Sequence, residues 1–142
     1  MLTLPDGSPV AWCLASPKLG EREVAMALLD RHSLQPGQVL IVDKGLAGAE
    51  VDRPVAGLEA VLVRPDRRDE PARFGSLAPV RQWVESVIDT LKGQLGLEQH
   101  GGRTLAGVHA RVAQRLLALA AAVWFNWQLG APAKRSLVAD DH

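Results

Sequence analysis

The feature that most constrains the fold is a run of four consecutive apolar residues, Val39 to Val42, in the first half of the chain. Gln35-Pro36-Gly37 turns the chain just before this run, and Asp43 follows it. An uninterrupted apolar run of this length is typical of a strand that is covered on both faces, as in sheets with helices on either side. We therefore expect an α/β fold in which this strand presents Asp43 at its carboxyl end.

Composition restricts the class of protein. The 142 residues are 47% hydrophobic and 23% charged, as in a globular domain with a buried core. Sixteen basic residues balance sixteen acidic ones, so any contact with nucleic acid has to be local. The single cysteine, Cys13, excludes a disulfide framework within one chain and favours a reducing, cytoplasmic setting. The longest apolar run, Leu116 to Phe125, is about half of the roughly 20 residues that span a bilayer, so we expect no membrane partner.

Turn residues and apolar periodicity predict the other elements. The expected strands are Leu2–Leu4 and Val10–Leu14, which form a hairpin, and Leu58–Val63. The expected helices are Glu21–His32, a short one at Ala47–Asp52, one from Val80 to Leu95, and a long one at Thr104–Leu129 with Leu105, Val108, Val112, Leu116, Leu119, Val123 and Trp127 on its apolar face. Residues 64–79 are expected to form a loop, residues 1–129 one domain, and residues 130–142 an extended tail. For Trp83, Trp124 and Trp127 we expect packing in a core or an interface rather than stacking on bases.

The helix after residue 79 carries a candidate site residue, Glu85. Glu85 lies beside the apolar stripe, with Arg81 one turn before it and Lys92 two turns after it. A carboxylate at the edge of a packed stripe is held in place, as a metal ligand must be, and a nearby lysine can reach a phosphate. Asp43 and Glu85 could therefore converge on Mg²⁺, which prefers oxygen ligands.

The residues alone leave other interpretations open. Glu85 can pair with Arg81, and Asp89 with Lys92, which would contribute only about 0.3–0.5 kcal/mol each on an exposed helix. Asp43 can simply shape the turn before the following glycines. These glycines lack the Gly-Lys-Ser/Thr continuation of a phosphate-binding loop, which argues against a nucleotide site.

The order of segments resembles the C-terminal part of a DDE-type transposase of bacterial insertion sequences. The resemblance runs from Leu2 to His142 through SPKLGEREVAMALLD, LIVDKGLAG, LVRPDRRDEP, RQWVESVIDTLKGQLGLEQHGGRT, RVAQRLLALAAAVWFNW and KRSLVADDH. Its strongest elements are the strand-end Asp43 and the helical Glu85 with Lys92 seven residues later.

The resemblance implies an RNase H-like α/β domain, with a mixed sheet flanked by helices, that cuts and joins DNA. It implies Mg²⁺, or Mn²⁺ in its place, held by an Asp, Asp, Glu triad in which Asp43 is similar to the second acid and Glu85 to the third. Lys92 is similar to the residue that contacts DNA near the transposon end, and Arg81 assists it. The implied partners are double-stranded DNA of transposon ends and target and further copies of the chain, at the bacterial nucleoid.

The chain departs from this family at its start. The family's first Asp lies on a first, central strand, which we expect upstream of Met1, and Asp6 in the hairpin turn is no substitute. We therefore expect a truncated or frame-split transposase that is incomplete as an enzyme on its own and needs the missing N-terminal segment. The alternative is a noncatalytic remnant that binds DNA or other transposase chains.

Overall fold

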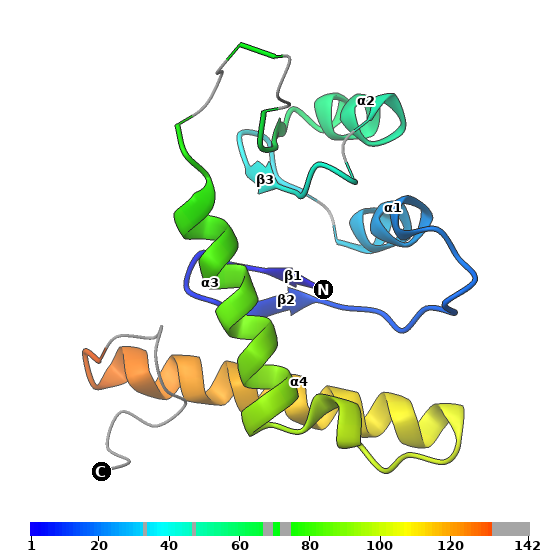
Figure 1. The fold of residues 1–142 in the computed structure, drawn as a ribbon, viewed down its shortest axis with the longest axis vertical. Helices are drawn as coiled ribbons and strands as arrows, with labels where there is room; N and C mark the ends of the chain where they lie inside the picture. The colour runs from blue at the N-terminus through cyan, green and yellow to red at the C-terminus, as the bar shows by residue number, and fades with distance from the viewer. Residues whose placement is uncertain (33, 47, 67–69, 72–74, 132–142) are drawn as a thin grey trace. The chain divides into compact units, whose positions relative to one another are not determined.

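The computed structural model describes residues 1–32, 34–46, 48–66, 70–71 and 75–131 (Figure 1). The chain divides into two compact units, which are described separately. The terminal unit combines Met1–Leu14 with Val80–His142, and the central unit comprises Ala15–Pro79. Helices and strands occur together, as expected for an α/β protein.

The central unit is built around a parallel pair of strands. Strand β3 (Val39–Ile41) runs alongside β4 (Val61–Val63), with Val39 opposite Val61. Helix α1 (Glu21–Arg31) precedes β3, and helix α2 (Ala49–Gly57) connects the two strands. Parallel neighbours require such a crossover connection, so this unit is a β–α–β arrangement preceded by one helix.

The core of the central unit lies along its helices. The buried residues are Leu28 and Leu29 of α1, Val51 and Val55 of α2, and Ala60 and Val63 at β4. The prediction that β3 is covered on both faces is wrong, because Val39 and Ile41 remain 59% and 44% exposed. Within the described part of this unit only two helices are present, and they offer too little surface to cover both faces of the pair.

The terminal unit begins with a hairpin of β1 (Leu2–Thr3) and β2 (Pro9–Ala11). In its turn, the Ser8 N–H donates to Asp6 Oδ1 at 2.8 Å. Gly7 has a φ of +93°, and a Cβ at this position would lie 3.3 Å from the Trp83 ring. The turn therefore needs glycine for its positive φ and for its close approach to Trp83, which lies on the helix that begins at Ala78.

The helices of the terminal unit follow one another closely. Helix α3 (Ala78–Asp89) continues into a π-helical turn, η1 (Thr90–Gln94), and a short 3₁₀ turn, η2 (Leu97–Gln99). The long helix α4 (Leu105–Gln128) starts at Thr104, whose hydroxyl accepts the Gly107 N–H at 3.1 Å. This helix matches its predicted extent because its cap and its apolar periodicity are both local signals.

One face of α4 forms the core of the terminal unit. Leu91 packs there with Val112, Leu116, Leu119 and Val123, and Trp12, Val87, Leu95, Leu97 and Val108 surround them. The predicted apolar face is wrong at its two ends, where Leu105 is 79% exposed and Trp127 is 72% exposed. Each residue of a helix advances by about 100°, so the residue that continues the inward face after Val123 is Asn126, which is only 2% exposed. Trp127 then points to solvent.

Within the described residues, the strands form two two-stranded sheets, β1–β2 and β3–β4. Of the predicted tail, residues 132–142 lie outside the described residues. Among the helices that the structure describes, none combines the length and the apolar character required to cross a membrane.

Candidate metal-binding and DNA-binding residues

Asp43 lies two residues beyond the end of β3, at the predicted carboxyl edge of the strand pair. Its side chain is exposed, and its Oδ1 accepts the Lys44 N–H at 2.8 Å. Its carbonyl oxygen accepts the Leu46 N–H at 3.1 Å, which closes a turn. Within the described ranges the second carboxylate oxygen has no hydrogen-bond partner, so Asp43 shapes the turn and still offers an oxygen to a ligand.

The loop after Asp43 is fastened to α1 by Arg22. Arg22 Nε donates to the Gly45 carbonyl at 3.0 Å, and a Cβ at Gly48 would meet the guanidinium at 3.7 Å. The sequence does not reveal this contact, because Arg22 lies 23 positions before Gly45 and stands between two acids, Glu21 and Glu23. Arg22 thus brings a positive charge to the loop that carries Asp43.

Glu85 projects from α3 into solvent, and its Oε1 accepts a hydrogen bond from Arg81 Nε at 3.0 Å. The two side chains are 58% and 72% exposed, respectively. The i,i+4 ion pair that competed with the metal interpretation is therefore formed. Because an exposed pair of this kind contributes only about 0.3–0.5 kcal/mol, a cation or a phosphate can displace it readily.

Lys92 lies on the π-helical turn η1, where the Leu95 N–H donates to the Thr90 carbonyl at 3.0 Å. The 100° steps that placed Lys92 beside Glu85 do not apply across such a widened turn. Lys92 Nζ pairs with Glu98 Oε1 at 2.9 Å, rather than with Asp89 as one interpretation had it. The hydrogen bond and the charge of Glu98 raise the pKa of Lys92, so this side chain remains a cation.

The segment that follows η1 is attached to α4 by Arg115. Arg115 Nε donates to the Gly96 carbonyl at 3.0 Å, and its Nη2 donates to the Gln99 carbonyl at 3.4 Å. A guanidinium that satisfies two loop carbonyls fixes the loop in one conformation. Sequence reasoning missed Arg115 because nothing in its neighbourhood distinguishes it from a solvated helix residue.

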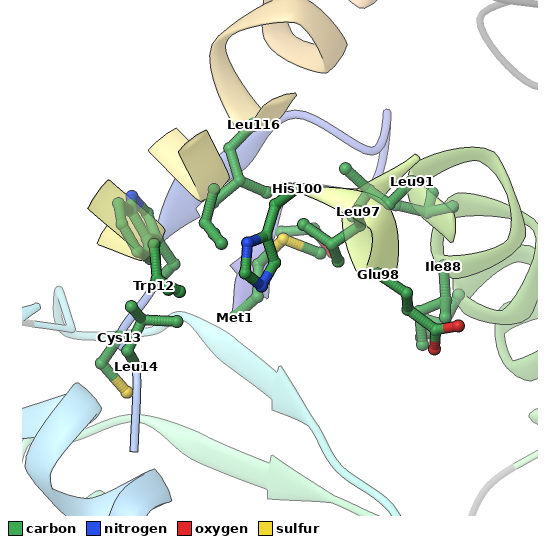
Figure 2. Close-up of a pocket in the computed structure, with 15 residues that line it drawn as sticks. Met1, Trp12, Cys13, Leu14, Ile88, Leu91, Leu97, Glu98, His100 and Leu116 are labelled. Atoms are coloured by element: carbon green, nitrogen blue, oxygen red, sulfur yellow. The ribbon is translucent and has the colours of Figure 1, made fainter. Parts of the chain in front are cut away.

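The terminal unit also contains an apolar cavity of about 550 Å³ (Figure 2). Trp12, Leu91 and Leu116 are among its lining residues, and Glu98 and His100 supply polar groups. His100 Nδ1 accepts the Gly102 N–H at 3.0 Å, so one ring nitrogen is already engaged. None of the four predicted site residues lines this cavity.

The predicted site residues divide between the two units: Asp43 belongs to the central unit, whereas Arg81, Glu85 and Lys92 belong to the terminal unit. No group of three or more His, Cys, Asp or Glu side chains in the described part of the chain is placed to hold a metal. The two predicted acids offer the oxygen donors that Mg²⁺ prefers. Comparison of the chain with family models, curated proteins and solved structures finds no match.

Proposed function

We propose that the chain is part of an RNase H-like catalytic domain of a DDE-type transposase, which cleaves insertion-sequence ends and transfers the strands. The observation that carries the proposal is the setting of Asp43. An exposed carboxylate directly beyond a parallel strand, with one oxygen held by its own turn and the other open, suits a metal ligand. Such an oxygen is already oriented when the ion arrives.

In this proposal Glu85 is the second ligand that the chain contributes. Its only described partner is Arg81, and both side chains are exposed, so exchanging that cation for Mg²⁺ requires no buried rearrangement. A third carboxylate, supplied by another segment or another chain, completes the triad. When bound, the two ions would activate a water or a 3′-hydroxyl and stabilise the leaving oxygen of the phosphodiester.

The basic residues give the proposed site its contact with DNA. Lys92 stays protonated beside Glu98, and Arg81 would be released once Glu85 turns to the metal. Both cations can then neutralise phosphates of the transposon end. A chain without net charge has to bind DNA through such a local group.

Metal binding by the intact chain tests the proposal. Free Mn²⁺ gives a sharp electron paramagnetic resonance signal that disappears when the ion is bound, so a titration measures affinity directly. We expect Asp43→Asn and Glu85→Gln each to weaken Mn²⁺ binding at least about tenfold, since the loss of a group that only supports a metal ligand already costs about 10–100-fold. The matched controls are Asp30→Asn on α1 and Asp89→Asn on α3, which remove exposed acids outside the site and should change nothing.

A second candidate function is a noncatalytic module that binds DNA or other transposase chains. The observation in its favour is the Arg81–Glu85 pair, in which Oε1 of Glu85 is already occupied by a cation of the chain. Gel shifts on DNA containing insertion-sequence ends distinguish the two functions. Binding that is unaffected by Glu85→Gln, together with no Mn²⁺ affinity, would favour the module over the enzyme.

A further inference from the structure

Helix α4 carries a second apolar stripe, apart from the face that forms the core. Its members follow one another at alternating spacings of four and three residues, the repeat of a coiled-coil seam. These residues, which we name the outer seam, are Ala106, Ala110, Ala113, Leu117, Ala120, Trp124 and Trp127.

The outer seam is largely open to solvent. Leu117 is 70% exposed, Trp124 is 61% exposed and Trp127 is 72% exposed, whereas the core residues of the same helix are buried. The only charged residues of α4 are Arg111 and Arg115, and neither belongs to the seam. A continuous exposed apolar strip of this kind marks an interaction surface more often than a solvated helix face.

We infer that the outer seam is a self-association surface, on which α4 packs against α4 of a second copy in antiparallel orientation. The order of side-chain sizes favours this partner, since alanines fill the N-terminal half of the seam and the large residues fill the C-terminal half. In the antiparallel register, Leu117 faces Ala120 of the second copy, Trp124 faces its Ala113, and Trp127 faces its Ala110. Each large side chain thus meets a small one, as close packing requires.

The area available sets the strength of the contact. A fully covered tryptophan buries about 150–250 Å², so at their present exposures Trp124 and Trp127 together can still bury roughly 200–330 Å². With Leu117 and the alanines added, the seam remains below the roughly 800 Å² per partner of a standard interface. The dimer should therefore be weak and should dissociate on dilution through the micromolar range.

The test is the mass of the intact chain by sedimentation velocity, from about 1 to about 200 µM, the range over which a small interface dissociates. We expect a concentration-dependent rise toward twice the 15.3 kDa of the chain. Leu117→Glu should abolish the rise, because it places a charge in the seam. Ala118→Glu is the matched control, since this neighbouring residue is also exposed but lies outside the seam, and it should dimerise like the unmodified chain.

Cross-linking tests the orientation. In a Cys13→Ser background, an equimolar mixture of L117C and A120C chains should form disulfide-linked dimers more efficiently than either variant alone. Preferential linking of L117C to itself would contradict the antiparallel register. A monomeric chain at every concentration, or a dimer that persists in Leu117→Glu, would overturn the inference. Neither experiment involves DNA or metal, so its outcome is independent of the proposed transposase activity.

Discussion

Leu119 should be the residue of α4 whose truncation costs most stability. It is only 3% exposed and packs with Leu91, Leu116 and Val123 in the core of the terminal unit. Replacing a buried leucine by alanine costs about 2–5 kcal/mol, because apolar contacts are lost and a cavity remains. With a urea dependence of about 2 kcal/mol per M, the middle of the usual range, a loss in the middle of that span should lower the unfolding midpoint of Leu119→Ala by about 2 M.

Tryptophan fluorescence is the appropriate assay for this variant. All four tryptophans lie in the terminal unit, so the signal reports on the unit that contains Leu119. Leu117→Ala is the matched control, since it removes the same atoms two residues earlier from a side chain that is 70% exposed. At protein concentrations low enough to keep the chain monomeric, this control should change stability by no more than about 0.5 kcal/mol.

A comparison of Leu119→Ala with Leu117→Ala decides which face of α4 is buried. If Leu119→Ala lowered the midpoint no more than Leu117→Ala, the assignment of an inner and an outer face to α4 would be refuted. If Leu117→Ala proved the more damaging of the two in the monomer, the helix would have to be rotated about its axis.

Three further outcomes follow from local contacts. Thr104→Ala should cost about 1 kcal/mol in urea unfolding, because the helix loses its N-cap, and Thr104→Ser should restore most of it. Gly102→Ala should be clearly destabilising in the same assay, since its Cβ would lie 2.7 Å from the backbone of α4, whereas Gly93→Ala meets open space and should be tolerated. Glu98→Gln should lower the pKa of Lys92, followed by NMR titration of its side chain. Folding raises the pKa of Lys92, so the Lys92–Glu98 pair stabilises the folded chain below pH 10.5, the ordinary pKa of lysine. This stabilisation is lost as the pH rises through the raised pKa. Glu98→Gln should therefore cost stability at neutral pH but not in strong alkali.

The sequence was informative wherever structure is decided locally. The start of α4 at Thr104, the hairpin turn at Gly7 and the strand before Asp43 are all found where turn and cap residues predicted them. The short helix predicted at Ala47–Asp52 is α2, which runs past this end and through Pro54, a residue that cannot donate a backbone hydrogen bond. It continues to Gly57 since Val51 and Val55 are almost fully buried, and that burial outweighs the lost bond.

Contacts between distant residues could not be predicted in this way. The Arg22–Gly45 bond joins α1 to the loop after β3, and no periodicity or motif relates those positions. The π-helical turn beneath Lys92 changes the direction of the side chain in a manner that a fixed 100° step cannot anticipate. The local settings of Asp43 and Glu85 were therefore predictable, whereas the groups that surround them were not.

The proposal that Asp43 and Glu85 bind one metal ion is tested most directly by iron-directed cleavage. Fe²⁺ can replace Mg²⁺ at oxygen ligands, and with ascorbate and peroxide it cuts the backbone beside the bound ion. The account predicts two cuts in the intact chain, one near Asp43 and one near Glu85. It also predicts that excess Mg²⁺, Asp43→Asn or Glu85→Gln suppresses both cuts together. Cuts that appear at only one of the two acids, or that respond to the two substitutions independently, would contradict it.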